Sequence, residues 1–306
     1  MKKFLQHIAY FSIAILAVLT LVDGVVTFQY HRKDTRKYAV WNDIKHKDLN
    51  ADVLIMGSSR AWCMYSPVIL DSVLGTNSYN LGIDGSSFDR QLARYDIYRH
   101  YQKAKPAYII QNVEFSSLDK TIGYEREQFM PYMMYPYFRE RIGKVEPFTC
   151  GELYIPMYRY YVNSFYEDYT NYDYSIKKGY YGNDRSWDGT KFDDIASYEA
   201  NVDSLTLKLF EDFLANSKQE GITVILVIAP YYKGIEKKVQ NLQEVHQIYY
   251  DLASQHDLPL LDYSKYSLSQ DTEYFYNATH LNRKGAELFS VQLAHDLDSI
   301  VFKHVR

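Results

Sequence analysis

Short apolar runs alternate with amphipathic stretches along most of this chain. Five runs rich in Val, Ile and Leu lie at 52–59 (DVLIMGSS), 78–83 (SYNLGI), 107–115 (AYIIQNVEF), 222–230 (ITVILVIAP) and 258–264 (LPLLDYS). Continuous apolar runs of this length are typical of strands that are covered on both faces, as in a parallel sheet. The pattern therefore predicts five buried strands.

Four stretches have the spacing of amphipathic helices: 86–104, 196–221, 239–257 and 282–304. The second ends at Gly221, and glycine is a common helix stop. Strands that alternate with helices predict a doubly wound α/β/α sandwich with a parallel sheet of about five strands. The chain of 306 residues is long enough to bury a full core and to carry an insertion.

The N-terminus predicts a membrane anchor. Residues 8–22 carry no charge, and the apolar stretch continues to Phe28, about the length that a bilayer core requires. A cleaved signal peptide is the alternative, but its apolar region is shorter and ends in a small-residue cleavage site, which is missing here. We expect an anchor at 1–28, a polar linker at 29–50 and the α/β/α domain at 51–306.

The orientation of this single-pass anchor rests on two opposing arguments. Four basic residues follow the apolar stretch (Arg32, Lys33, Arg36 and Lys37) and outnumber the lysines before it, which favours a cytoplasmic domain. Long domains, however, translocate largely regardless of such charges. We expect an extracytoplasmic domain.

One segment, at about 116–195, interrupts the alternation. It is rich in proline, glycine and tyrosine, and it holds much of the chain's total of 32 tyrosines. An insertion after the third strand leaves the carboxyl edge of the sheet, where ligands bind in open α/β folds. Tyrosine rings suit stacking on sugars, so the insertion is a candidate lid or substrate platform; the alternative is an aromatic segment that packs on itself.

Charge and cysteine content exclude several classes of site. The 34 basic and 38 acidic residues give no electrostatic reason to expect a nucleic-acid partner. Two distant cysteines, Cys63 and Cys150, make neither a disulfide framework nor a zinc spacing. We find no metal-ligand cluster, phosphate loop or dinucleotide fingerprint, and we expect no cofactor.

Four positions at strand ends or just before a helix are candidates for chemistry: Ser59, Gly82, Asn112 and His280. Each has a structural alternative. Ser59 could cap a helix, Gly82 could permit a tight turn, Asn112 could serve a buried turn, and His280 could pack at a helix entry. Their combination in this order on this fold favours a functional site.

These blocks resemble the SGNH or GDSL-like hydrolases and acyltransferases, which share a flavodoxin-like α/β/α domain. GSSR matches the block that holds the family's nucleophilic serine, and NLG, QNV and NATH match the other three blocks. The anchor and the THLNRKGA block are closest to the membrane-anchored extracytoplasmic branch, which is related to alginate O-acetylation and to D-alanyl transfer onto teichoic acids. The resemblance covers roughly 50–115 and 200–300.

The resemblance implies acyl transfer without a metal or a cofactor. Ser59 would attack an ester carbonyl, and His280 would take its proton. The N–H groups of Ser59 and Gly82 and the side-chain amide of Asn112 would hold the oxyanion, with the field of a helix starting just after Ser59 in support. Arg60, Trp62 and Asp84 are candidates for lining the substrate cleft. The α/β-hydrolase elbow G-x-S-x-G is absent.

Two departures from the family pattern matter. Ser58 stands where the family usually has Asp, and Asn277 replaces the Asp that lies three residues before the histidine. Asparagine can orient an imidazole but brings no negative charge, and in a serine protease the Asp-to-Asn change lowers the rate by about 10⁴. The site could rest on a Ser59–His280 dyad, or on a carboxylate from Asp84, Asp262 or Asp271.

Three functions follow. The leading hypothesis is an esterase or O-acyltransferase that handles an acyl group, foremost acetyl, on a cell-envelope or exported polysaccharide, beside a glycan or a membrane acyl-transfer partner. The second is a catalytically silent glycan-binding or assembly protein, suggested by Asn277 and Ser58. The third is an esterase or lipase for small or lipid esters, which would need an apolar acyl channel.

Overall fold

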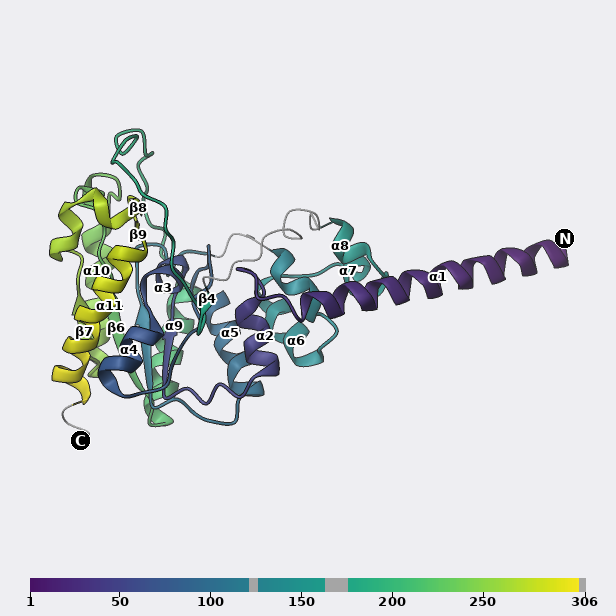
Figure 1. Cartoon of the computed structure of the whole chain (residues 1–306), viewed down its shortest axis with the longest axis horizontal. Coiled ribbons are helices and arrows are strands. Elements are labelled where there is room, and N and C mark those ends of the chain that lie inside the picture. Colours follow the sequence, from purple (N-terminus) through teal and green to yellow (C-terminus); the bar gives the residue numbers. More distant parts are fainter. Residues whose placement is uncertain (121–125, 163–175, 303–306) are drawn as a thin grey trace. The chain divides into compact units, whose positions relative to one another are not determined.

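The computed structural model describes residues 1–120, 126–162 and 176–302 (Figure 1). Its contacts divide the chain into two compact units. The N-terminal unit comprises 1–42 and 123–174, and the sheet unit comprises 43–122 and 175–306. The part of the predicted insertion at 163–175 lies outside the described residues.

A five-stranded parallel sheet forms the centre of the sheet unit. Its strands are β1 (Val53–Met56), β2 (Ser78–Asn80), β3 (Tyr108–Asn112), β6 (Thr223–Ile228) and β7 (Leu260–Asp262), in the order β2-β1-β3-β6-β7. Counted along the chain this order is 2-1-3-4-5, the flavodoxin-like arrangement. The predicted fold class and all five predicted strands are confirmed.

Helices cover both faces of this sheet. They are α3 (Ser59–Met64), α4 (Pro67–Leu74), α5 (Phe88–Tyr101), α9 (Ser204–Gln219), α10 (Leu242–His256) and α11 (Arg283–Leu297). The four predicted helices correspond to α5, α9, α10 and α11. Among shorter elements of this unit, β4 (Ile176–Lys177) pairs with β5 (Tyr180–Tyr181) and β8 (Phe275–Asn277) pairs with β9 (His280–Leu281). Short 3-10 turns lie at Ile235–Lys237, Ser267–Gln270 and Thr272–Tyr274, and a π turn at Asp298–Phe302 follows α11.

The pleat of the strands explains why helices pack on both sides. Val53, Ile55 and Ile110 share one core cluster with apolar side chains of α4 and α11, and alternate strand residues face the opposite way. On the opposite face of the sheet, Phe88 of α5 packs edge-to-face on Phe210 of α9 at 4.6 Å between ring centroids. Because both faces are buried, the strands read as continuous apolar runs rather than as alternating ones.

The N-terminal unit is built around α1 (Lys2–Tyr30), a helix that is long and apolar enough to cross a membrane. The other elements of this unit are η1 (Arg126–Tyr132), α6 (Pro136–Val145), α7 (Cys150–Tyr154) and α8 (Tyr158–Val162), and α2 (Ala39–His46) begins in it. The segment 29–50, expected as a polar linker, therefore contains a helix. Trp41 is buried against Phe129 and Phe138, and this apolar burial explains why the segment is ordered.

The tyrosine-rich insertion does not fold as one platform. Its residues 126–162 belong to the N-terminal unit, where Tyr132 donates a hydrogen bond to Asn42 Oδ1 (2.6 Å) and Tyr160 pairs with Thr27 (2.6 Å). Its first residues, up to 122, and its last part, from 175 on, belong to the sheet unit that carries the candidate site. Tyr160 thus packs with α1 and Tyr132 with α2, whereas Tyr154, Tyr158 and Tyr161 are exposed.

Candidate active site

The chain leaves β1 through Gly57 and enters α3 at Ser59. Gly57 has φ of +148°, and a Cβ there would lie 2.6 Å from Ala61 Cβ and 2.9 Å from Asn112 Cβ, so glycine is required by both conformation and space. Ser58 is the N-cap of α3 and accepts a hydrogen bond from the N–H of Arg60 (3.3 Å). The helix cap is therefore Ser58, and the hydroxyl of Ser59 is left for another partner.

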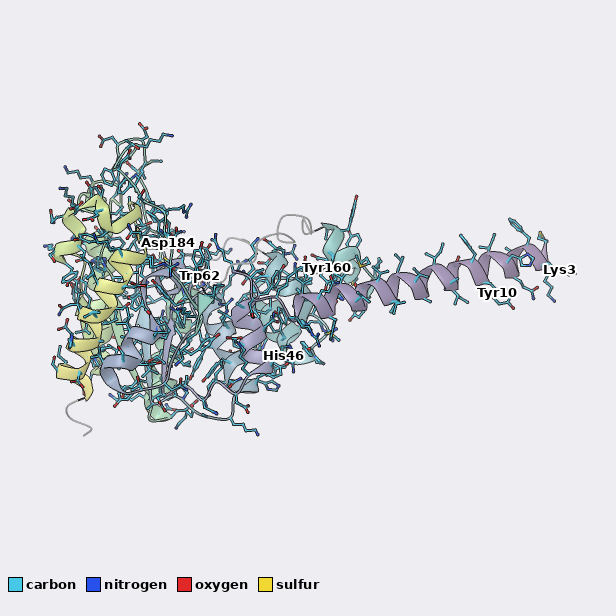
Figure 2. The ribbon with its side chains drawn as sticks, in the orientation of Figure 1. Lys3, Tyr10, His46, Trp62, Tyr160 and Asp184 are labelled. Carbon is cyan, nitrogen blue, oxygen red and sulfur yellow. The ribbon has the colours of Figure 1, made fainter. Side chains whose placement is uncertain are left out.

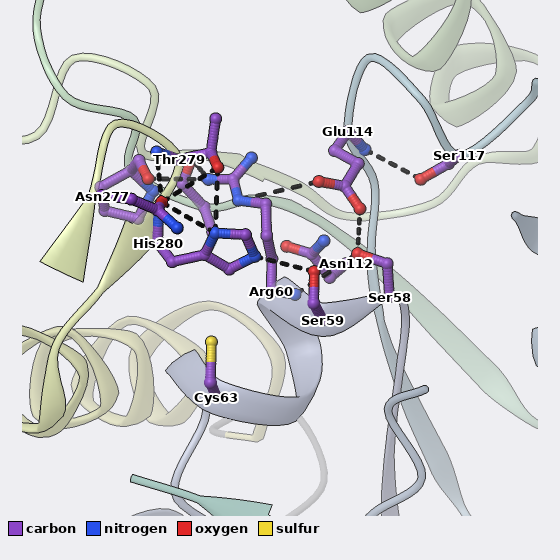
Figure 3. A network of polar contacts seen from close by, with 12 residues as sticks. Ser58, Ser59, Arg60, Cys63, Asn112, Glu114, Ser117, Asn277, Thr279 and His280 are labelled. Atoms are coloured by element: carbon purple, nitrogen blue, oxygen red, sulfur yellow. Dashed lines mark hydrogen bonds and ion pairs between the residues drawn. The ribbon is translucent and has the colours of Figure 1, made fainter. Parts of the chain in front are cut away.

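That partner is His280. Ser59 Oγ lies 2.7 Å from His280 Nε2, and both side chains are partly exposed (Figure 3). His280 opens β9, which follows the β8–β9 turn ahead of α11. The structure thus brings together two residues that the sequence singled out, at the hydrogen-bond distance that proton transfer needs.

Asn277 determines which nitrogen of His280 carries the proton. Asn277 Oδ1 accepts hydrogen bonds from the N–H groups of Thr279 (3.0 Å) and His280 (2.9 Å), so this atom is the acceptor oxygen of the amide. His280 Nδ1 lies 2.9 Å from the same oxygen and therefore donates to it. The proton on Nδ1 leaves Nε2 as an acceptor, and Ser59 donates its hydroxyl hydrogen to Nε2.

Thr279, which the sequence reasoning did not single out, adds a second contact to this histidine. Its Oγ1 lies 2.9 Å from His280 Nδ1 and donates to Asn277 Oδ1 at 3.2 Å (Figure 3). The ring of Tyr276 stacks on His280 with 5.2 Å between centroids and 18° between planes. These contacts from one short hairpin hold the imidazole in a single orientation.

Asn112 has the properties of an oxyanion donor. It ends β3, it is fully buried, and its Oδ1 accepts a hydrogen bond from Tyr65 Oη (2.7 Å). Its Nδ2 has no hydrogen-bond partner among the residues that the structure describes. A buried donor without a partner costs stability, and such a group is explained by strain, by a catalytic role, or by a water or ion that it binds. The N–H of Ser59 is a second donor, because the first N–H groups of a helix have no acceptor within it.

Gly82 does not take the expected role. Its N–H already donates to Asn80 Oδ1 (2.8 Å), and its carbonyl accepts from Arg94 Nη1 (2.7 Å). A Cβ at this position would lie 2.4 Å from the backbone nitrogen of Trp62. Glycine is needed here because α3 passes close to the backbone, and the N–H is used inside the protein.

Arg60 and Trp62 do not line an open cleft. Arg60 is fully buried, and its Nη2 donates to the carbonyls of Ala229 (2.8 Å) and Pro230 (2.7 Å). Trp62 is also buried and stacks on Tyr181 with 4.6 Å between centroids. Both residues point into the protein because the first turns of α3 pack on the sheet.

The three alternative carboxylates differ in what surrounds them. Asp262 accepts hydrogen bonds from Tyr250 Oη and from the N–H of Ser264, and Asp271 accepts the N–H of Glu273 (2.9 Å). Burial is the main cause of the raised pKa of the partly buried Tyr276 phenol, and the charge of Asp84 raises this pKa further. Asp84 therefore lies near Tyr276. Among Asn277, Asp262 and Asp271, the residue whose oxygen faces His280 Nδ1 is Asn277.

A buried ion pair lies behind Ser59, and the sequence did not single it out. Glu114, two residues beyond Asn112, accepts a hydrogen bond from Ser58 Oγ, and its other oxygen lies 3.9 Å from Arg60 Nε (Figure 3). The guanidinium of Arg60 lies 3.6 Å from the ring centroid of Tyr231. Burial raises the pKa of Glu114, and Arg60 and Ser58 oppose that shift. The sequence signal for this pair is a glutamate two residues after the end of a buried strand.

The neighbouring thiol is not a competing nucleophile. Cys63 is buried, its Sγ lies 3.6 Å from Tyr276 Oη, and burial raises its pKa to about 12. Cys63 and Cys150 are both free thiols. Within the described residues, His, Cys, Asp and Glu side chains form no group of three or more that could hold a metal ion.

Comparisons with known proteins give distant structural similarities. No protein-family model and no curated protein sequence matches the chain. Similar solved structures include a GDSL-like lipase from Bacteroides thetaiotaomicron (13% identity over 81% of this chain and 89% of that chain, TM-score 0.38). An acetylxylan esterase from Geobacillus stearothermophilus shares 12% identity over 82% of this chain and 94% of that chain, with a TM-score of 0.42.

A third structure is a family two carbohydrate esterase from Clostridium thermocellum in complex with cellohexaose. It shares 9% identity over 83% of this chain and 65% of that chain, with a TM-score of 0.39. At these values the similarities assign no function to this chain. A functional assignment therefore has to rest on the side-chain geometry.

The raised pKa of Glu114 predicts a pH dependence of stability. Because the pKa of the folded state lies above the ordinary value of 4.5, the folded protein binds this proton more tightly than the unfolded chain. Stability therefore falls as pH rises from 4.5 through the raised pKa. Glu114→Gln removes this titration. Urea denaturation of both proteins gives the difference in unfolding free energy, wild type minus variant, and this difference should decline over the same pH range.

The exposed Glu220, paired with Arg99 at 2.9 Å, provides the matched control. Glu220→Gln should change the free energy of unfolding by less than about 0.5 kcal/mol. A wild-type advantage over Glu114→Gln that grows with pH would show that Arg60 outweighs burial at this site.

Proposed function

We propose that this protein is a serine-dependent esterase or O-acyltransferase of the SGNH type. The observation that carries the proposal is the continuous set of hydrogen bonds from Ser59 Oγ to His280 Nε2 (2.7 Å) and from His280 Nδ1 to Asn277 Oδ1 (2.9 Å). Asn112, whose Nδ2 has no partner among the described residues and whose side chain lies beside this set in Figure 3, supports it. An oriented imidazole that accepts a serine proton is the arrangement that activates a serine for attack on an ester.

The reaction follows from this geometry. Ser59 Oγ attacks the ester carbonyl while His280 Nε2 takes the hydroxyl proton, and the Asn112 amide and the Ser59 N–H stabilise the oxyanion. Collapse of this intermediate breaks the bond to the alcohol, which leaves with the proton from Nε2. Water or a second hydroxyl then donates a proton to His280 and attacks the acyl-serine, and Ser59 is restored.

The proposed substrate is an acylated glycan, foremost an acetylated cell-envelope or exported polysaccharide. Partly exposed aromatic rings support this choice. The Tyr232 N–H donates to the carbonyl of Ala278 (3.1 Å), one residue from Asn277, and the rings of Trp187 and Phe192 contact Tyr232 at 5.0 and 5.5 Å. Flat aromatic rings with polar edges are suited to stacking on sugars. For O-acyl transfer, we propose that a membrane partner supplies the acyl groups.

The neutral Asn277 favours a second candidate, a glycan-binding or assembly protein without turnover. Asparagine fixes the tautomer of His280 but adds no charge to stabilise the imidazolium that forms during attack. The two candidates share the site and differ in the reactivity of Ser59.

A fluorophosphonate probe is expected to label Ser59 in the purified full chain, because the probe phosphonylates serines that a neighbouring base activates. Ser59→Ala should abolish labelling, and Ser72→Ala, which changes an exposed serine on α4, should leave it unchanged. Mass spectrometry of the labelled peptide checks the position. Equal labelling of wild type and Ser59→Ala would favour the binding protein.

Asn277→Asp is expected to raise the turnover of an aryl acetate by about tenfold or more, because the carboxylate would stabilise the imidazolium of His280. Asn277→Ala should lower turnover, because it removes the acceptor that orients Nδ1. Steady-state kinetics with all three proteins test this. An unchanged rate in Asn277→Asp would mean that another group already supplies the charge.

We also propose that α1 anchors the chain in a membrane with the remaining residues on the extracytoplasmic side. The exposed Cys150 should react with a membrane-impermeant maleimide in intact spheroplasts, while the buried Cys63, whose pKa is raised to about 12, should not. Gel shift on labelling checks this. Reaction only after permeabilisation would place Cys150 in the cytoplasm.

A further inference from the structure

The helix α1 has two parts with different surroundings. From Lys2 to Val22 its apolar side chains, such as that of Tyr10, are exposed (Figure 2). Thr27 and Tyr30 are buried in the N-terminal unit. Residues 4–22 are 19 positions that rise about 1.5 Å each, and their length matches a hydrocarbon core of about 30 Å. The first buried residues of the helix follow Asp23, its first acidic residue, while Val25 and Phe28 stay exposed.

A set of polar contacts holds the start of α8 beside this boundary. The carboxylate of Asp23 pairs with Arg159 and accepts the N–H of Met157 (2.8 Å). One turn further along α1, Thr27 Oγ1 lies 2.6 Å from Tyr160 Oη, and the ring of Tyr30 stacks on that of Tyr160 at 5.7 Å. The segment around residue 158 is therefore fixed next to the turns of α1 in which its first buried residues occur.

Apolar side chains surround these contacts. Five exposed residues of α7 and α8 form what we call the α7–α8 patch: Tyr154, Ile155, Tyr158, Tyr161 and Val162. Tyr161 is 84% exposed and Tyr154 is 70% exposed. The stretch from 153 to 162 contains one charged residue, Arg159, and Asp23 neutralises it. Clustered exposed apolar side chains mark an interaction surface.

We infer that the α7–α8 patch is a membrane-contact surface that lies in the headgroup region of the bilayer that α1 crosses. The inference rests on the proposed anchor. A bilayer is the partner that fits, because the patch adjoins the end of the spanning part of α1 and is dominated by tyrosine, which is enriched at membrane interfaces. A spanning α1 brings residues 154–162 to that depth, since Met157 and Arg159 contact Asp23.

The consequence is a rigid attachment. A single helix followed by a flexible linker would let the rest of the chain move away from the lipid. The Asp23–Arg159 pair, the Tyr30–Tyr160 stack and the patch instead attach the N-terminal unit to the bilayer at two places, α1 and α7–α8. The membrane surface then determines the orientation of this unit.

Depth-dependent fluorescence quenching tests the inference in the full chain, reconstituted in vesicles of phosphatidylcholine and phosphatidylglycerol. Cys150 opens α7, four residues before Tyr154, and it is exposed, so it takes an environment-sensitive fluorophore directly. We expect lipids with a headgroup nitroxide to quench it at least about twofold more than lipids with a mid-chain nitroxide. Tyr154→Ser/Tyr161→Ser should reduce the headgroup quenching by about half or more.

Two further proteins serve as controls. Ser12→Cys in a Cys150→Ser background places the fluorophore mid-way along the apolar part of α1, where mid-chain nitroxide should quench more strongly. Glu140→Ser/Lys144→Ser removes two exposed, paired side chains of α6 and should leave quenching at Cys150 unchanged. Circular dichroism of each variant checks that the helices are retained.

The outcomes separate the inference from the proposals on which it rests. Deep quenching at position 12 with no lipid quenching at Cys150 would keep the anchor and overturn the membrane-contact patch. Absence of quenching at both positions would overturn the anchor and the patch together. Neither result bears on the fluorophosphonate labelling of Ser59, because that reaction depends on groups of the sheet unit.

Discussion

The hydrogen bond between Ser59 and His280 joins residues 221 positions apart, and it depends on the parallel sheet. In a parallel sheet every strand delivers its carboxyl end to the same edge, so residues that follow different strands meet there. Ser59 follows β1, Asn112 ends β3, and the hairpin that carries His280 comes after β7. The apolar strands that form the core thereby also assemble the site.

Buried polar groups make this edge specific. Ser58, Glu114 and Arg60 link the ends of β1, β3 and β6 behind the nucleophile, and Arg60 reaches the carbonyls after β6. Burying such charges is costly unless partners are in place, and removing one partner leaves the other uncompensated. The pair therefore favours one arrangement of the strand ends over its alternatives. Ser59 lies in the first turn of a six-residue helix, and its proposed role requires such a fixed arrangement.

The N-terminal unit solves a different problem. Under the proposed anchoring, α1 ends in lipid headgroups, and the chain that follows needs partners for its polar groups at that level. Asp23, Thr27 and Tyr30 of α1 find them in Arg159 and Tyr160, far along the chain. Part of the tyrosine content is thereby explained by contacts of Tyr30 and Tyr160 within this unit.

The sequence by itself determined the elements and the candidates. Apolar runs and amphipathic spacing predicted the strands and the main helices, because burial on both faces and helical periodicity leave local patterns. Short blocks singled out Ser59, Asn112, Asn277 and His280, because strand ends and helix starts are local too. What surrounds a side chain is decided by segments distant in sequence. The engaged N–H of Gly82, the burial of Arg60 and Trp62, the Glu114–Arg60 pair and the division of the tyrosine-rich segment all follow from such packing. Tertiary structure alone settled them, because burial and hydrogen-bond partners are properties of contacts between segments.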